Sequence, residues 1–532
     1  MRSAFLIVFF SLSSAIISQK KPNNSSVDYL KHFHEFYQLL DENYIDTLNH
    51  EKLMDHVLKT TASSLDQYSQ YFNQEESILR NKSWSGISYA GIGASINYIK
   101  KNAIIEHCKK GYGADSAGLM SGDLIVEIND SAIKNTNLNN TINLLKGEAG
   151  TVVKIKVKRG NSIKVFKIKR RHIITPSIPY SKIEDHGFGV VKINQFLKGS
   201  GIVFRNEIID LVEKGAQGFV LDLRGNKGGI VKECVSMLSV FLSKNTLVCE
   251  LKSKDPKSNY KKYTLYEPIS TKCPIVILID SKTMSSAEIF AGAMQDLDRA
   301  VLIGDTTFGK GLVQGTRYLQ DRSSLYVTAA KYYLPSGRTI HKRLNSKKFI
   351  FSSIPHEKEI FFTLNQRLVR GNNGLSPDIY VSPSTTPNEI VSAVYKSRLE
   401  FDYVVSMLRN QESSEPKNQE TDKKAYYNFL IKNINQINLV FEKQWNQIKE
   451  AKLQFNPSWS VNKKIEKEIL NTKKKLIKAY IDDLYYQMNK TLIYHSKYHD
   501  GLYEFKLKKD DCFGEAIKVL SDMDKYKMTL NH

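Results

Sequence analysis

The chain has 532 residues, too many for one hydrophobic core, so its length predicts about three or four domains. Apolar residues make up 41% of the chain and aromatic residues 10%, which excludes a protein that is disordered throughout. The formal net charge is +22, but lysines are spread along the whole chain without a compact basic motif, so we predict no nucleic-acid partner.

The first 19 residues have the layout of a secretory signal peptide. Met1 and Arg2 precede an apolar run from Ala4 to Phe10, and small residues follow as far as Ile17. This run is short for a transmembrane helix, and no clean A-x-A cleavage site follows it. Two outcomes stay open: removal at export, or retention as an anchor in the inner membrane. Both predict an exported protein of the periplasm or cell envelope.

Hydrophobic periodicity divides the rest of the chain into four regions. Helical spacing predicts an N-terminal helical region over 27–84, and short alternating strands predict a β-rich domain over 85–173. Strands and helices alternate over 174–386, which predicts a mixed α/β core. Residues 387–532 are Lys-rich with helical periodicity and predict a helical C-terminal extension. The predicted fold class is therefore α+β with several domains.

The cysteines do not form a metal or redox motif. The chain has no C-x-x-C and no H-E-x-x-H, so we predict no metal site and no zincin protease. Buried free thiols are the simplest interpretation, although one pair could oxidise in an exported protein. The five residues are Cys108, Cys234, Cys249, Cys273 and Cys512.

A serine stands where the strand predicted over 275–280 gives way to a helix. Ser285-Ser-Ala-Glu288 is an S-x-x-E capping box, so Ser285 could be an ordinary N-cap. The same geometry would project its hydroxyl from a rigid turn and aim the N–H of Ser286 outward at the positive end of the helix dipole. Such an N–H suits an oxyanion that forms at an attacked carbonyl. Both interpretations stay open at this point.

Lys310 is the candidate base for that serine. A serine hydroxyl needs a base, and no histidine lies within 281–340. A lysine can serve if burial lowers its pKa, and Gln314 could orient the amine by hydrogen bonding. The alternative is a surface lysine. A P-loop ATPase is excluded because Gly311 replaces the required Ser or Thr and a strand follows it.

Two further positions have both a structural and a functional interpretation. In Leu221-Asp-Leu-Arg-Gly-Asn-Lys-Gly-Gly229, Gly228 is either part of a plain strand-to-helix turn or a second oxyanion donor. Asp296 follows Ser285 by eleven residues, which returns it to nearly the same helix face. It is either a solvated acid or a supporting group of the site.

Together these segments resemble the carboxyl-terminal processing, or tail-specific, serine proteases of peptidase family S41. The resemblance covers roughly residues 30–385 and rests on five segments in order. They are D-L-R-G-N-K-G-G (222–229), S-S-A-E-I-F-A-G-A-M-Q-D (285–296), G-D-T-T-F-G-K-G-L-V-Q (304–314), Y-Y-L-P-S-G-R (332–338) and G-L-S-P-D (374–378). Lys227 departs from the family, which more often has proline there.

The resemblance implies a crotonase-like protease core with Ser–Lys catalysis and no cofactor. Ser285 would be the nucleophile, Lys310 its base and Gln314 the group that orients the amine. The N–H groups of Gly228 and Ser286 would form the oxyanion hole, with Asp296 in support.

Residues 85–173 resemble the PDZ domain of the same family. A-G-L-M-S-G-D-L-I-V-E-I-N over 117–129 is close to the PDZ signature, and a carboxylate-binding loop fits just before a strand. A substrate tail would add a strand there, with its carboxylate on the loop amides. The implied peptide-binding residues are Gly91, Ile92, Gly93 and Ala94.

We therefore predict a secreted or periplasmic serine endopeptidase that cleaves exported proteins near their C-termini after its PDZ domain has bound the tail. Its partners would be proteins with exposed C-terminal tails. The competing hypothesis is a catalytically silent PDZ adaptor that only binds such tails. The sequence leaves open the substrates, the oligomeric state and an association with the inner membrane.

Overall fold

The architecture was obtained as a computed structural model. The predicted signal peptide, residues 1–19, lies outside the described residues. The structure describes residues 26–83, 87–99, 102–133, 136–342, 359–382, 388–409, 419–455 and 463–531.

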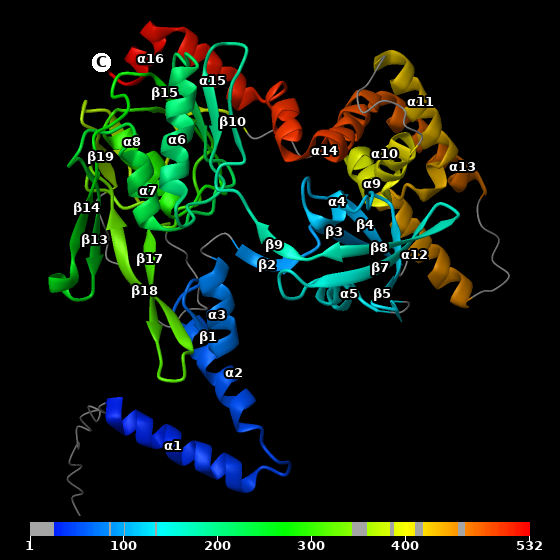
Figure 1. Ribbon diagram of the computed structural model, residues 1–532, viewed down its shortest axis with the longest axis horizontal. Helices are drawn as coiled ribbons and strands as arrows, with labels where there is room; N and C mark the ends of the chain where they lie inside the picture. The colour runs from blue at the N-terminus through cyan, green and yellow to red at the C-terminus, as the bar shows by residue number, and fades with distance from the viewer. Residues whose placement is uncertain are drawn as a thin grey trace, which may run out of the picture.

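The N-terminal region is helical with one short strand. It contains α1 (Ser26–Asn43), α2 (His50–Ser63), β1 (Gln70–Phe72) and α3 (Gln74–Ser83). Asn49 caps α2 by accepting a hydrogen bond from the N–H of Lys52. Figure 1 shows α1 well clear of the body, whereas β1 joins a sheet of the core, where Tyr71 pairs with Leu325. The sequence did not predict this strand.

A small β domain follows, as the PDZ resemblance implies. Its main sheet has the order β3-β4-β5-β7-β8 with β6 on β5, and β2 pairs with β9 where the chain enters and leaves the domain. Alternate residues of β7 (Val153, Ile155 and Val157) are fully buried. The elements are β2 (Ile87–Gly91), β3 (Ala94–Ile99), β4 (Asn102–Cys108), α4 (Gly113–Ser116), β5 (Leu124–Ile128), β6 (Ser131–Ala132), α5 (Leu138–Leu145), β7 (Val152–Arg159), β8 (Ser162–Lys169) and β9 (Arg171–Ile174).

The α/β core is built on a six-stranded sheet of order β10-β11-β12-β15-β16-β21, parallel except for β10. A second sheet, β1-β18-β13-β14 with β17 on β18, lies beside it. The core elements are β10 (Tyr180–Ile183), β11 (Gly189–Lys192), α6 (Ser200–Glu213), β12 (Phe219–Asp222), α7 (Val231–Leu238), β13 (Leu247–Ser253), η1 (Pro256–Ser258), β14 (Tyr260–Tyr263), β15 (Ile275–Ile279), α8 (Ser286–Asp296), β16 (Val301–Gly304), β17 (Leu312–Tyr318), β18 (Ser324–Tyr333), β19 (Ile360–Phe362), β20 (Leu368–Arg370) and β21 (Ile379–Tyr380).

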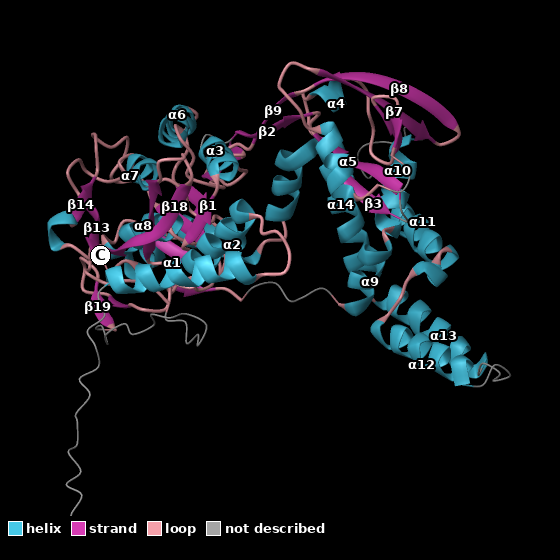
Figure 2. Cartoon of the chain, turned by 90° about the horizontal axis from the view of Figure 1, so that it is seen from below, coloured by secondary structure: helices cyan, strands magenta, loops and turns pink. Residues whose placement is uncertain are grey.

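The C-terminal extension is helical, as predicted. Its helix α14 is bent at Tyr498, whose φ of 59° is not helical. Figures 1 and 2 show α14 beside the β domain, and Figure 1 shows its continuation into α15 and α16 at the core. Residues of α15 and α16 pack against strands of the core sheet. The elements are α9 (Glu389–Ser397), α10 (Leu399–Arg409), α11 (Gln419–Lys432), η2 (Ile434–Gln436), α12 (Val440–Phe455), α13 (Lys463–Ala479), α14 (Ile481–Leu507), α15 (Asp511–Ser521) and α16 (Met523–Thr529).

The end of the extension completes the core. Along the parallel strands alternate residues are buried on opposite faces, as expected for a sheet covered on both sides. Val191 and Ile277 belong to the cluster formed with α6, α7 and α8. Val190 and Val276 belong to the opposite cluster, which includes Phe513 of α15. The predicted α+β class is confirmed, but the extension is partly built into the core rather than appended to it.

The middle of the extension packs against the β domain and contacts the buried ring of His107. The ring of His107 in β4 is 4% exposed and stacks on Tyr494 of α14, with 4.2 Å between ring centroids. The Ser121 hydroxyl and Nδ1 of His495 form a hydrogen bond with 2.9 Å between the oxygen and the nitrogen. Further polar contacts join Glu106 to Arg398, Asp115 to Tyr498, and the Gly122 carbonyl to Arg409.

Acidification is expected to weaken this interface. Burial, together with the charges of neighbouring histidines, lowers the pKa of His107 and of His495 from 6.5 to about 4. Asp115 and Glu106 oppose this shift, while Arg398 reinforces it at His495. Since the folded state binds these protons more weakly, the stabilisation is complete above pH 6.5 and is lost as the pH falls toward 4.

Amide hydrogen exchange in β4 and α14 between pH 7 and 4 would measure the weakening, after correction for the intrinsic exchange rate. A His107→Phe variant keeps an aromatic ring at the stack and removes one titrating group, so its pH dependence should be smaller. An unchanged pH dependence in this variant would contradict the role of His107.

Within the described ranges, each helix is either too short or too polar to cross a membrane. All five cysteines are free, and Cys108, Cys234 and Cys249 are buried.

Candidate active site

Three consecutive parallel strands end at the same edge of the core sheet, and each is followed by a predicted site segment. The loop after β12 carries Gly228, the turn after β15 carries Ser285, and the loop after β16 carries Lys310. Loops at the carboxyl ends of parallel strands commonly form binding sites, because these ends converge at one edge. The topology thus gathers residues that are up to 82 positions apart in the chain, from Gly228 to Lys310.

Ser285 occupies a strained turn at the start of α8. Its φ of 59° and ψ of −124° are unusual for a residue with a side chain. Gly228 packs directly against it: a Cβ on Gly228 would lie 2.7 Å from the Ser285 Cβ and 2.9 Å from the Ser286 nitrogen. The Ser285 side chain is partly exposed, whereas Ser286 is buried. The strained turn therefore places a partly exposed serine at the start of α8.

Glu288 holds the serine and lysine segments together. Its buried carboxylate accepts the N–H of Ser285 and the N–H of Lys310, both at 2.8 Å on Oε2. The other oxygen, Oε1, accepts the N–H of Gly309 at 2.7 Å and the Thr307 hydroxyl at 2.6 Å. Burial outweighs these four hydrogen bonds and raises the pKa of Glu288 to about 7. Sequence reasoning identified this glutamate only as part of a capping box.

Tyr332 makes a second bridge between the same two segments. Its buried hydroxyl donates to the Lys310 carbonyl at 2.7 Å and lies 3.3 Å from the Ser285 carbonyl. With Glu288 on the N–H groups and Tyr332 on the carbonyls, the backbones of Ser285 and Lys310 are held from both sides. The fold therefore determines the relative position of the two residues.

The amine of Lys310 is half-buried over an aromatic ring. Its Nζ lies 4.6 Å from the centroid of Tyr68, which precedes β1 in the N-terminal region. Burial, reinforced by the charge of Arg80, lowers the pKa of Lys310 below 10.5, although Glu288 opposes the shift. Among the described residues, no hydrogen bond joins this amine to the Ser285 hydroxyl. Burial thus shifts the protonation equilibrium of this amine toward the neutral form that a base requires.

The two predicted oxyanion donors differ in their availability. Ser286 is the first residue of α8, so its N–H has no acceptor within the helix. The Gly228 N–H instead donates to Oδ1 of Asn226 at 2.8 Å, and the Asn226 amide donates to the Ile193 carbonyl at 2.9 Å. An oxyanion could reach the Gly228 N–H only after Asn226 releases it. This competing acceptor was not foreseen from the sequence.

Comparisons with known proteins identify the family. The model of peptidase family S41 matches residues 187–346, and a PDZ domain model matches residues 104–159. The carboxy-terminal processing protease CtpA of Bacillus subtilis (strain 168) is 30% identical over 339 residues, which cover 64% of this chain and 72% of that protein. This chain belongs to peptidase family S41. It is a serine-type peptidase that carries a PDZ domain.

Two further proteins match larger shares of the chain at lower sequence identity. A probable CtpA-like serine protease of Staphylococcus haemolyticus (strain JCSC1435) is 28% identical over 426 residues, 78% of this chain and 84% of that protein. Among solved structures, the photosystem II D1 C-terminal processing protease is 22% identical, with a TM-score of 0.38. The match covers 67% of this chain and 88% of the chain of that protease.

Two residues that the S41 resemblance placed in the site have other contacts here. The Gln314 amide in β17 donates to the Thr328 hydroxyl at 3.2 Å rather than to Lys310. Asp296 ends α8, about 15 Å along the helix axis from Ser286. There it pairs with Arg338 at 2.8 Å. Asp296 thus stabilises the Y-Y-L-P-S-G-R turn, and its predicted supporting role is structural rather than at the reacting groups.

The PDZ residues form a turn into an open sheet edge. Gly91 ends β2, where it pairs with Arg171, and the next residues lead into β3. The carbonyl of Ile92 accepts the Ala114 N–H at 2.8 Å, and Gly93 has a φ of 79° that favours glycine. Among the described strands of this sheet β3 pairs with β4 alone, so its other edge has no partner strand. This arrangement suits the predicted role of residues 91–94.

Proposed function

We propose that this S41 peptidase cleaves exported proteins near their C-termini, with Ser285 as nucleophile and Lys310 as general base. The observation that carries the proposal is the Glu288 carboxylate, which binds the N–H groups of both residues at 2.8 Å. A serine on a strained turn and a half-buried amine of lowered pKa, held by one buried group, suit acyl transfer.

The reaction would proceed in two steps. Neutral Lys310 takes the proton of Ser285 while its Oγ attacks the scissile carbonyl, and the resulting oxyanion binds the N–H groups of Ser286 and, once Asn226 turns away, Gly228. The protonated amine of Lys310 then gives its proton to the leaving nitrogen, and the peptide bond breaks to leave an acyl-enzyme. Water, deprotonated by Lys310, hydrolyses this ester and regenerates Ser285.

The PDZ domain would select the substrate. A tail can add a strand to the open edge of β3, with its terminal carboxylate at the turn formed by residues 91–94. The signal-like first 19 residues support export to the periplasm or cell envelope. The names of the relatives, carboxy-terminal processing protease and CtpA-like serine protease, agree with this substrate class.

A Ser285→Ala variant separates the peptidase from a silent PDZ adaptor. Cleavage should fall to background because no other hydroxyl replaces the nucleophile, while tail binding should be unchanged. Mass spectrometry of a random-sequence peptide library with free C-termini would measure cleavage and its position. The same library with amidated C-termini is the control, and it should be cleaved less. Equal cleavage by wild type and variant would refute the assignment of Ser285.

A further inference from the structure

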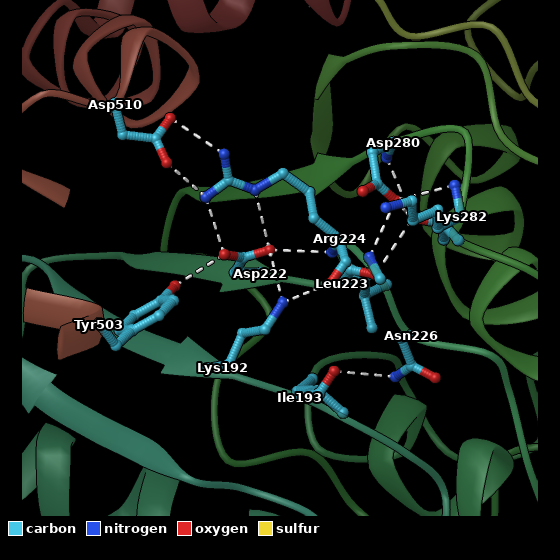
Figure 3. A network of polar contacts seen from close by, with 12 residues as sticks. Lys192, Ile193, Asp222, Leu223, Arg224, Asn226, Asp280, Lys282, Tyr503 and Asp510 are labelled. Carbon is cyan, nitrogen blue, oxygen red and sulfur yellow. Dashed lines mark hydrogen bonds and ion pairs between the residues drawn. The ribbon is translucent and has the colours of Figure 1, made fainter. Parts of the chain in front are cut away.

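The end of the C-terminal extension contacts the segment that leads into the oxyanion loop, defined here as residues 222–229. Figure 3 shows Asp222 and Arg224, the first residues of this loop, facing Tyr503 and Asp510 of the extension. Asp222 ends β12, while Tyr503 lies in the second half of α14 and Asp510 is the N-cap of α15. Residues about 280 positions apart therefore meet at the start of the loop that carries Gly228.

A buried carboxylate is the centre of this contact. Asp222 is 1% exposed and accepts hydrogen bonds from Lys192 at 3.1 Å and from the Tyr503 hydroxyl at 2.7 Å. Its two oxygens also bind Arg224, at 2.9 Å from the backbone nitrogen and 2.8 Å from Nη2. Although burial opposes ionisation, the charges of Lys192 and Arg224 hold the pKa of Asp222 well below its ordinary value. The Asp222 carboxylate is thus ionised, and both of its oxygens accept hydrogen bonds.

Arg224 connects this carboxylate to the extension. One side of its guanidinium binds Asp222, and the other binds Asp510, with Nη1 at 2.9 Å from Oδ1 and Nη2 at 2.7 Å from Oδ2. Such bidentate pairs restrict orientation as well as distance. The Arg224 side chain is 21% exposed, so the pairs are only partly screened by water.

The backbone that Arg224 anchors leads directly to the catalytic serine. Two residues later, Asn226 accepts the Met284 N–H on its carbonyl at 2.9 Å and holds the Gly228 N–H on its side chain at 2.8 Å. Gly228 in turn lies against Ser285. A shift of Arg224 would therefore move Asn226 and the Gly228 N–H that it holds, which is the predicted second oxyanion donor.

We propose that Asp510 and Tyr503 are positioning residues for the S41 reaction, through which the C-terminal extension fixes the oxyanion loop. This inference rests on the proposed function, because it assigns these residues to the geometry of the oxyanion hole. The simpler alternative is that α15 and α16 only cover the sheet. A positioning role predicts that replacing Asp510 lowers kcat, whereas a covering role predicts that it lowers only the melting temperature.

An Asp510→Asn variant of the full chain tests the proposal. Asparagine caps helices as well as aspartate does, so α15 keeps its N-cap while the ion pair with Arg224 is lost. We expect kcat on a peptide substrate to fall by about tenfold or more, with KM and the melting temperature nearly unchanged. Affinity for a peptide boronic acid, whose serine adduct mimics the oxyanion, should fall by a similar factor.

Companion variants make the result specific. Asp510→Glu should restore part of the loss, and Tyr503→Phe, which removes one hydrogen bond to Asp222, should show a smaller loss of the same kind. Glu504→Gln is the matched control, since Glu504 lies beside Tyr503 in α14 but pairs with the exposed Lys182 at 3.0 Å. It should behave as wild type.

Wild-type kcat and boronate affinity in Asp510→Asn and Tyr503→Phe would overturn the proposal. So would losses that appear only in the melting temperature, because a covering role predicts these. A wild-type protein that cleaves no peptide would instead overturn the proposed function, and this inference with it.

Discussion

Replacing Lys310 with methionine is expected to lower kcat by roughly a thousandfold, within the range that general bases contribute. Methionine keeps an unbranched chain against Tyr68 but cannot take the Ser285 proton. KM should change little, because the lysine is assigned to the proton transfer rather than to substrate binding. Steady-state cleavage of a fluorogenic peptide measures both constants.

The pH profile distinguishes a base from a merely structural lysine. In the wild type, kcat/KM should rise as the pH increases through a pKa that burial and Arg80 hold below 10.5, because only the neutral amine accepts a proton. In the Lys310→Met variant this rise of kcat/KM with pH should be absent. Lys282→Ala, which removes an exposed lysine from the turn before Ser285, is the control and should keep wild-type kinetics. A variant of Lys310 that retains most activity would refute the assignment.

Replacing Glu288 with alanine is expected to have the largest effect on stability. The change would leave three N–H groups and the Thr307 hydroxyl without their acceptor in a buried site. Each buried group left unpaired costs about 1–3 kcal/mol, and water in the cavity would recover part of this. We expect the free energy of unfolding to fall by about 3–5 kcal/mol and cleavage to be lost. Urea denaturation and peptide cleavage measure the two effects.

Glu288→Gln is the informative partner variant. Glutamine keeps one side-chain oxygen and has an NH₂ group in place of the other. This NH₂ group would face N–H donors that now bind a carboxylate oxygen, so activity should drop sharply with a smaller loss of stability. In the wild type, protonation of Glu288 below about pH 7 would similarly remove an acceptor, so activity should decline as the pH falls through this value. Wild-type activity in Glu288→Gln would contradict the view that this carboxylate positions Ser285 and Lys310.

Local motifs predicted the parts of the site that are continuous in the chain. The S-x-x-E segment located Ser285 at a helix start, and the order of strands and glycine-rich turns predicted the α/β core. The burial of Glu288, which turns a capping residue into a shared anchor, depends on the loop after β16 folding over it. Nothing in the four residues of the motif specifies that contact.

The remaining errors and omissions involve geometry that hydrophobic periodicity and short motifs do not specify. Tyr68 reaches Lys310 from a region that periodicity described only as helical. Asn226 was one of several residues in a glycine-rich loop, and its bond to Gly228 depends on the local turn. Asp296 returns to the Ser285 face of α8 but lies at the opposite end, so angular periodicity alone misplaced it. The extension was predicted to be helical, but its place behind the core sheet required the tertiary structure.

The most direct measurement is the rate at which a fluorophosphonate labels the protein, followed by mass spectrometric mapping of the labelled residue. If neutral Lys310 activates the hydroxyl, the label will lie on Ser285 and its rate will rise with pH in the wild type. In Lys310→Met the rate will be low across the same pH range. Labelling at another residue, or equal rates in the two proteins, would contradict the Ser–Lys pair.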